Sequence, residues 1–407
     1  MAWDLQNINS GKMKNVNAKI VLDFIRCQQP VSRKDIARST RLTIASISNI
    51  TNELIAQNYI EEIGTTQSEE GRKVVVFGIQ GHKGYVIGAE LEVSHIRCVI
   101  TNFKAEVIYQ SDHATELEKG VDYVLDNIIT IVEEAIEDSG VARDKIIGIG
   151  IVAPGPYDQE KGIMVNPPNF KGWKKIPIRE FIEKKMNIAT YFEKDAVGAV
   201  LAEYWIANRY SDKNNNIFAL LVNDVGIGGG AIVEGKPYRG NVNGACEIGH
   251  SIIDINGPLC SCGNYGCLEA IINREKVIEK VVRKLKLGES SQLKKLVNDY
   301  DNINIGHIFE QAERGDQLCV DVVREISNHL SLAVLNIIAM FSPKMIVLCG
   351  DMFLESPLLL DHTLKMCDEK VGGRHGNNVD IIKGTFKNYQ CAMGAAALVL
   401  QNFYTTF

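Results

Sequence analysis

The feature that most restricts the possible folds is a pattern that occurs twice along the chain. Residues 84–110 alternate like successive strands, and a helix is expected over 121–139, before the apolar strand in "KIIGIGIVAPGP". The same order returns, because "NIFALLVNDVGIGGGAIVEGKPYRG" is typical of a strand pair and "DVVREISNHLSLAVLNIIAMFSPKMIVLCGD" of a helix followed by an apolar strand. The repeat predicts a duplicated α/β body with a ligand cleft between two lobes.

Helical segments precede this body. In residues 16–28, Val16, Ile20, Phe24 and Cys27 fall on one helical stripe. The stretch "SRKDIARST" opens with a capping-box spacing, and "LTIASISNITNELIAQNYI" supplies a further helix with small polar residues on its outer face. Two strands joined by a polar turn are then expected in "YIEEIGTTQSEEGRKVVVFGI". This order predicts a winged helix-turn-helix, which would bind DNA.

The charge of this first part fits contact with DNA. Residues 11–60 hold eight Lys or Arg against three Asp or Glu, whereas the whole chain has a net charge of -6 and is not a general polyanion binder. In contact with DNA, small polar side chains would approach the major groove, and basic side chains would neutralise phosphates. The alternative interpretation is a helical hairpin that mediates protein contacts. The expected DNA contacts are Arg33, Lys34, Thr43, Ala45, Ser46, Ser48, Asn49, Asn52, Arg72 and Lys73.

Length and composition indicate a cytoplasmic protein. The 407 residues are enough for two or three domains, and 45% hydrophobic with 23% charged residues is ordinary for a globular chain. The opening residues "MAWDLQNINSGKMK" contain no apolar stretch of signal-peptide length, and no segment reaches eighteen apolar residues. No membrane partner is therefore expected. Because thiols stay reduced in the cytoplasm, the cysteines are interpreted as buried thiols and metal ligands rather than a disulfide framework.

A compact cysteine motif predicts a metal site. Cys260, Cys262 and Cys267 lie in "CSCGNYGCLEA", and "CEIGH" supplies His250 ten residues upstream. Three thiolates and one imidazole satisfy the tetrahedral preference of zinc, and glycines let so short a loop bend around one ion. Unliganded core cysteines and a redox pair are the alternatives, although the spacing is not the usual one for thiol exchange. Four protein ligands would close the site, so the expected role of one Zn²⁺ per chain is structural.

These motifs resemble those of the ROK family of repressors, open reading frames and sugar kinases. The resemblance rests on "EIGH" followed by "CSCGNYGCLE", and it extends through "GIGIVAPGPYD", "NPPNFKGW", "EKDAVGAVLAE" and "GIGGGAIVEGKPYRG". It implies an actin-like, hexokinase-like (RNase H-like duplicated) fold with a sugar in the cleft. It also implies that the first domain is the DNA-binding domain of the repressor branch, as in the xylose-operon repressors.

The resemblance also assigns sugar contacts. The family's ligand positions correspond to Asn169, Asp195, Glu247, His250 and Glu269, and Asp195 is where the kinases place their general base. His250 would serve twice, because one ring nitrogen binds the metal and the other remains available to a carboxylate or sugar hydroxyl. The residue before Asp195 is usually Asn. Here it is Lys194, which is included among the expected ligand contacts and would change or abolish sugar binding.

The phosphate-binding loops depart from the kinase pattern. The family's first loop runs approximately Asp-x-Gly-Gly-Thr-Lys, whereas this chain has Glu90 to His95, with Glu92 where phosphate oxygens would lie. In the second loop, Asp224 and Val225 replace the first Gly-Thr. Carboxylates at both loops would repel a triphosphate. We therefore expect no kinase activity and a vestigial role for Asp195.

The resulting prediction is a sugar-responsive repressor of a carbohydrate-utilisation operon, which binds a pseudo-palindromic operator as a homodimer or a tetramer. An ATP-dependent sugar kinase with a fused DNA-binding domain is the alternative, as is a repressor controlled by a partner protein. The expected domains are the winged helix-turn-helix over 1–80, a first α/β lobe over 81–195, a second lobe with the zinc site and dimerisation surface over 196–385, and a C-terminal helix over 386–407 that packs on the first lobe.

Overall fold

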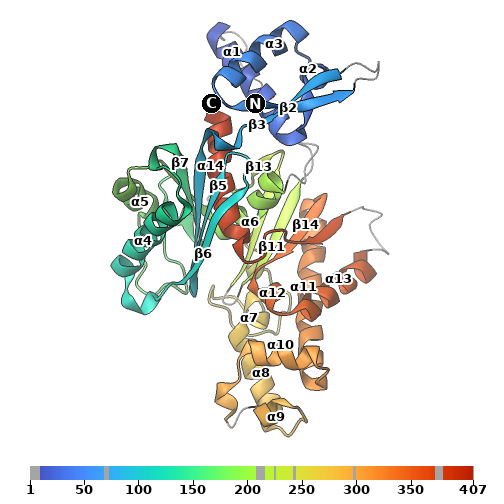
Figure 1. Cartoon of the computed structure of the whole chain (residues 1–407). Coiled ribbons are helices and arrows are strands. Elements are labelled where there is room, and N and C mark those ends of the chain that lie inside the picture. Colours follow the sequence, from blue (N-terminus) through green and yellow to red (C-terminus); the bar gives the residue numbers. More distant parts are fainter. Residues whose placement is uncertain are drawn as a thin grey trace.

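The computed structural model describes residues 10–67, 73–207, 216–223, 226–241, 244–296, 299–371 and 379–406. Its first part is a helical unit with a small sheet. The elements in chain order are α1 (Ser10–Gln28), β1 (Val31–Ser32), α2 (Arg33–Thr40), α3 (Ile44–Ala56), β2 (Ile60–Gln67) and β3 (Lys73–Ile79). The strands pair antiparallel in the order β1-β3-β2. We refer to residues 10–79 as the N-terminal unit, which lies at the top of Figure 1.

Capping explains where the helices of this unit begin and end. Ser32 accepts a hydrogen bond from the backbone of Asp35, whose carboxylate accepts one in return, and this capping box starts α2. Arg41, with φ of 60°, ends α2 in the left-handed region, and Thr43 caps α3. These two helix ends produce the tight turn between α2 and α3.

The first lobe is a five-stranded sheet with helices on one flank. Its strands are β4 (Tyr85–Leu91), β5 (His95–Asn102), β6 (Val107–Ala114), β7 (Ile146–Ala153) and β10 (Thr190–Lys194), in the order β10-β7-β4-β5-β6. β10, β7 and β4 are parallel, whereas β4, β5 and β6 form an antiparallel meander. Helices α4 (Val121–Ser139) and α5 (Ile178–Met186) connect them, and a short hairpin joins β8 (Tyr157–Asp158) to β9 (Ile163–Met164).

The second lobe repeats this arrangement. Its strands β11 (Ile217–Val222), β12 (Ile227–Val233), β13 (Lys236–Pro237), β14 (Met345–Cys349) and β15 (Asp380–Lys383) lie in the order β13-β12-β11-β14-β15. Again the first three in sequence form an antiparallel meander, and the last two add in parallel. The matching strand orders confirm the duplicated α/β body predicted from the repeated pattern.

Helices cover the second sheet and extend the lobe. They are α7 (Leu268–Ile272), α8 (Arg274–Lys286), α9 (Leu293–Leu296), α10 (Ile305–Glu313), α11 (Gln317–Phe341), α12 (Asp351–Glu355) and α13 (Pro357–Val371). Apolar residues of α11 pack on buried side chains of β11 and β14. Within the described residues, no helix combines the length and apolar character that crossing a bilayer requires.

Two helices lie between the sheets, and one of them, α14, reaches the N-terminal unit (Figure 1). α6 (Asp195–Leu201) follows β10 directly, and α14 (Gln390–Thr406) packs against β4, β7 and α6. Close approach requires Gly150 and Gly394, because a Cβ there would lie 1.9 Å from the carbonyl oxygen of Ala395 and 1.8 Å from that of Gly198. One apolar cluster continues from the N-terminal unit through these helices, so the unit and the body share a core.

The apolar stripe predicted on α1 is partly buried only at its C-terminal end, where Phe24 and Cys27 pack against the core. Val16 and Ile20 are 46% and 45% exposed, whereas Val21, Leu22 and Ile25 are fully buried. The first helix is apolar around much of its circumference, and its periodicity alone does not choose between two stripes. Packing against β3, α3 and α14 decides which stripe is buried.

Candidate functional site

A cavity of about 360 Å³ opens between the two lobes, within the range typical of small-molecule sites. Loops at the carboxyl ends of strands from both sheets form its walls, together with the segment after β13 and the first turn of α7. The structure brings together all six side chains predicted to contact a sugar, although they are spread over a hundred residues of sequence. Asn169, Lys194, Asp195, Glu247, His250 and Glu269 all line this cavity.

An ion pair occupies part of the cavity wall. Lys194 Nζ lies 2.6 Å from Glu247 Oε1, and the Lys194 side chain is only 6% exposed, whereas that of Glu247 is 38% exposed. Lys194 ends β10 and precedes α6, so the strand–helix junction aims it into the cavity. The lysine that departs from the family pattern therefore partners one of the carboxylates expected to bind sugar. A ligand that uses Glu247 must share this carboxylate with Lys194.

Two further carboxylates of the cavity are held by backbone amides. Asp195 begins α6 and accepts a hydrogen bond from the amide of Ala196. Burial raises the pKa of Asp195 to about 6, although Lys194 and the amide of Ala196 act in the opposite direction. Glu269, in the first turn of α7, accepts the amide of Ile227 at 3.1 Å and thereby ties α7 to the start of β12. In each of these two carboxylates, the oxygen that accepts the amide hydrogen bond retains a further lone pair, which can accept a hydrogen bond from a ligand hydroxyl.

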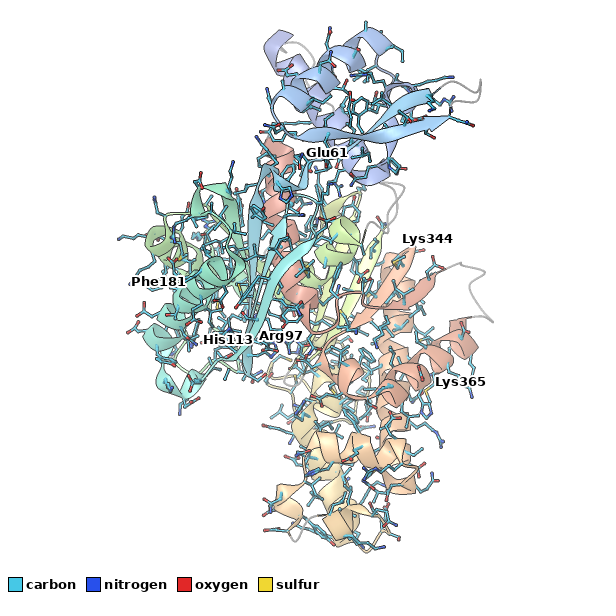
Figure 2. The ribbon with its side chains drawn as sticks, viewed as in Figure 1. Glu61, Arg97, His113, Phe181, Lys344 and Lys365 are labelled. Atoms are coloured by element: carbon cyan, nitrogen blue, oxygen red, sulfur yellow. The ribbon has the colours of Figure 1, made fainter. Side chains whose placement is uncertain are left out.

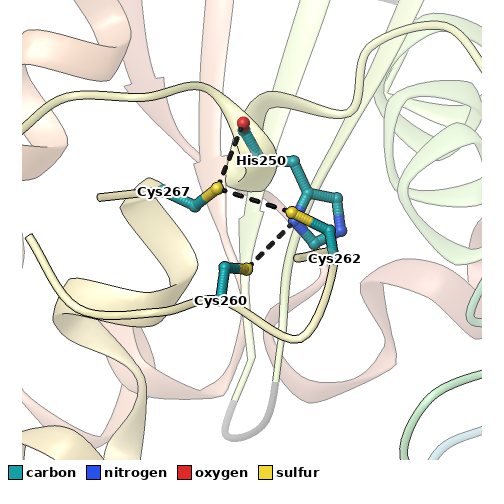
Figure 3. Close-up of side chains that lie close together, drawn as sticks. All are labelled: His250, Cys260, Cys262 and Cys267. Carbon is teal, nitrogen blue, oxygen red and sulfur yellow. Dashed lines mark hydrogen bonds between the residues drawn. The ribbon is translucent and has the colours of Figure 1, made fainter. Parts of the chain in front are cut away.

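The predicted metal ligands form one tight cluster (Figure 3). His250, Cys260, Cys262 and Cys267 offer ligand atoms that all lie within 4.8 Å of one another. Cys260 Sγ is 3.6 Å from His250 Nδ1, and Cys262 Sγ is 3.6 Å from Cys267 Sγ. Ligands about 2.3 Å from a tetrahedral ion lie roughly 3.8 Å apart, which matches these separations. The donor set and its geometry therefore fit one metal ion.

Local backbone geometry makes this cluster possible. His250 closes a short 3-10 turn, and Cys267 precedes α7. Gly266 has φ of 71°, and a Cβ there would lie 1.6 Å from the carbonyl oxygen of Asp254, so only glycine fits. Because His250 belongs both to the cluster and to the cavity wall, an ion bound here would fix one side of the cavity.

The region of the first predicted phosphate loop is filled by buried polar side chains. Glu90 and Glu92 are 2% and 4% exposed. Glu92 Oε1 accepts Asn223 Nδ2 from the second lobe at 2.8 Å, and Arg97 donates to Asp351 Oδ1 at 3.3 Å. Arg97 lies on β5 beside the second lobe (Figure 2). These contacts join the two lobes beside the cavity. The second predicted loop, Asp224–Val225, lies outside the described residues.

Sequence reasoning missed Glu92 and Asn223 as cavity residues. Both line the cavity beside Asp195. The departure of Glu92 from the family pattern is visible in the sequence, but there it predicts only repulsion of a triphosphate. The partner Asn223 is 131 residues away, and no local signal connects the two.

Most of the expected DNA-contacting residues are exposed. Lys34, Thr43, Ala45, Asn49, Asn52 and Lys73 are exposed, and Ser46 and Ser48 are half-buried. Arg33 is less accessible, because it donates to Thr51 Oγ1 at 2.9 Å and to Asn52 Oδ1 at 2.8 Å and lies over the ring of Phe77. Arg72 lies outside the described residues.

Comparison with known proteins relates the whole chain to one family. The model of the ROK family matches residues 86–402. A putative xylose repressor from Caldicellulosiruptor sp. (strain Rt8B.4) is 27% identical over 395 residues, which cover 97% of this chain and 98% of the relative. The xylose repressor of Bacillus subtilis (strain 168) is 26% identical over 392 residues, or 96% of each chain.

Solved structures of ROK family proteins are also similar to this chain. A ROK family transcriptional regulator, a homologue of the E. coli MLC protein, has a TM-score of 0.77 at 25% identity and covers 96% of this chain and 97% of its own. A ROK family glucokinase from Streptomyces griseus, in complex with glucose and AMPPNP, has a TM-score of 0.68 at 23% identity and covers 78% of this chain and all of its own, which shows a common fold. Because the family model spans most of its length, this chain belongs to the ROK family.

Proposed function

We propose that the chain is a sugar-responsive transcriptional repressor of a carbohydrate-utilisation operon, without kinase activity, that acts in the cytoplasm. The observation that carries this proposal is the gathering of the six expected sugar contacts in one interlobe cavity, in a chain whose N-terminal unit shares a core with the body. The repressor names of relatives that match nearly the whole chain support it.

In this proposal the N-terminal unit is a winged helix-turn-helix. The tight turn between α2 and α3 and the antiparallel hairpin β2–β3 support this assignment. Helix α3 would enter the major groove with Thr43, Ala45, Asn49 and Asn52, and Lys34 and Lys73 would contact phosphates. A homodimer would place two such units on a pseudo-palindromic operator, because one half-site gives little specificity.

The proposed ion in the Cys/His cluster is zinc, held by His250, Cys260, Cys262 and Cys267. Three thiolates and an imidazole prefer Zn²⁺ over harder ions, and four protein ligands leave no open position for hydrolysis. When bound, zinc would supply a fixed tetrahedral crosslink between the turn of His250 and the loop before α7. The four ligand residues would then hold the neighbouring Glu247 and Glu269 in place around a sugar, because these two carboxylates flank the cluster in sequence.

A continuous helical path supports communication between the cavity and the N-terminal unit. Asp195 begins α6, and α6 continues without a break into a π-helix over Ala202–Ile206. Trp205, in that π-helix, is covered by Arg26 of α1, whose guanidinium carbon lies 3.8 Å from the ring centroid. Arg26 Nη1 also donates to the carbonyl oxygen of Trp205 at 3.1 Å. A sugar that displaces Asp195 would therefore move the surface on which α1 rests.

Replacement of Glu247 by Ala tests whether the cavity is the sensor. We expect operator affinity to remain and sugar affinity to fall about tenfold or more, because a charged hydrogen-bond acceptor is lost. Isothermal titration with the sugar and fluorescence anisotropy with operator DNA measure the two effects. Glu137→Ala, on the exposed side of α4, is the control. Asn169→Ala provides a second test of the same wall, and an undiminished sugar response in both variants would contradict a sensor role for the cavity.

A further inference from the structure

We propose that Glu92 is a ligand-contacting residue that restricts the cavity to unphosphorylated, uncharged sugars. This inference rests on the proposed sugar-sensing function and specifies the class of effector. Glu92 directly follows β4, at the carboxyl end of a central strand, and lines the cavity together with Val93, Asp195 and Asn223.

The Glu92 carboxylate is held in one orientation by both lobes. Its Oε1 accepts Asn223 Nδ2 at 2.8 Å, and its Oε2 accepts the amide of Val93 at 3.3 Å. Asn223 is positioned in turn, because its Oδ1 accepts the amide of Asp351 at 3.3 Å. Each carboxylate oxygen can accept more than one hydrogen bond, so Glu92 retains capacity for a ligand hydroxyl. The side chain is thus a fixed acceptor in the wall of the cavity.

The charge around Glu92 is unfavourable for an anion. Among the described residues that line the cavity, four are carboxylates, Glu92, Asp195, Glu247 and Glu269, and the single lysine is paired with Glu247. Asn223 Nδ2 and the backbone amide of Val93 both donate to the Glu92 carboxylate, and such donors favour its ionised form. An ionised Glu92 beside these carboxylates repels a further anion. A sugar phosphate would add between one and two negative charges at neutral pH.

The usual means of binding a phosphate are also occupied. Proteins hold phosphates with arginine forks, lysines or free backbone amides at helix N-termini. No arginine is among the described residues that line the cavity. The amide of Ala196 at the start of α6 is taken by the Asp195 carboxylate, and that of Ile227 at the start of β12 by Glu269. Hydroxyl groups meet no such barrier, because they donate hydrogen bonds to carboxylates.

Titration of the full-length chain with matched pairs of sugars tests this inference. The probes are D-xylose, D-glucose and N-acetyl-D-glucosamine, each compared by isothermal titration with its terminal phosphate ester. For every sugar that binds, we expect the ester to bind at least about 100-fold more weakly. In Glu92→Gln, which keeps the shape of the side chain but not its charge, the difference in affinity between a sugar and its ester should shrink to about tenfold. Glu90→Gln removes an equally buried carboxylate that does not line the cavity, and it should change the difference by less than about threefold.

The outcomes separate this inference from the proposed function. If an ester binds the unaltered chain as tightly as its parent sugar, or more tightly, the inference is overturned while sugar sensing stands. If a folded Glu92→Gln variant shows the same difference in affinity between a sugar and its phosphate ester as the unaltered chain, Glu92 does not select against phosphate. If none of the probes binds, the sugar-sensing function fails, and the inference fails with it.

Discussion

Replacing Cys267 by Ala is expected to remove bound zinc and to lower the free energy of unfolding by about 4 kcal/mol at a free zinc concentration 1,000 times the dissociation constant. The unaltered chain should contain one zinc ion. Cys267 is fully buried and lies at the start of α7, between the cavity residues His250 and Glu269. Loss of one of four ligands should therefore release the loop before α7 and weaken sugar binding as well. Elemental analysis and thermal unfolding measure the two effects.

Cys319→Ala is the matched control for this experiment. Cys319 is equally buried, in α11, but lies outside the cluster, so its replacement should keep the metal and cost only the packing of one sulfur atom. Equal losses of stability in both variants would contradict a structural metal. So would a metal-free chain whose unfolding is unaffected by added zinc.

Replacing Arg26 by Ala is expected to uncouple the two functions of the molecule. Coupling free energies between sites are typically 1–3 kcal/mol, so a saturating sugar should weaken operator binding of the unaltered chain by about fivefold or more. Without the Arg26 contacts to Trp205, movement of α6 would no longer reach α1, and the effect should fall below about twofold. Sugar affinity, measured by titration, should stay unchanged. Arg26→Lys keeps the charge but not the planar stack, and should uncouple nearly as well.

Lys104→Ala separates this path from general loosening of the N-terminal unit. Lys104 bonds Glu61 at 3.0 Å across another part of the same junction, where Glu61 is seen at the base of the N-terminal unit (Figure 2). This pair is partly exposed and contributes little energy. The variant should therefore respond to sugar as the unaltered chain does. A loss of response equal to that of Arg26→Ala would contradict a specific path through Trp205.

Local patterns predicted the parts of the structure that local physics determines. The repeated order of strands and helix anticipated two sheets with matching topology, because alternation and helical periodicity report directly which residues are buried. The Cys/His cluster was recognised for a similar reason. Its four ligands span only eighteen residues, and the geometry of one ion dictates their chemical types.

Contacts between distant segments were not predictable in this way. Arg26 and Trp205 are 179 residues apart, and neither belongs to a recognisable motif. Glu92 and Asn223 meet only because the two lobes face each other across the cavity. The burial of each apolar position of α1 was not predictable, because two apolar stripes compete and packing against β3, α3 and α14 selects between them. Such choices belong to tertiary packing, which a single sequence does not display.

The most direct test of the central claim is the operator affinity of the full-length chain with and without sugar. An operator can be selected from random duplex DNA and its affinity measured by fluorescence anisotropy at fixed salt, since salt strongly affects such binding. We expect preferential binding of a pseudo-palindromic duplex over competitor DNA, and a loss of about fivefold or more in affinity when a sugar occupies the cavity. A chain that selects no duplex, or whose operator affinity is the same in the presence of every sugar that it binds, would contradict the account.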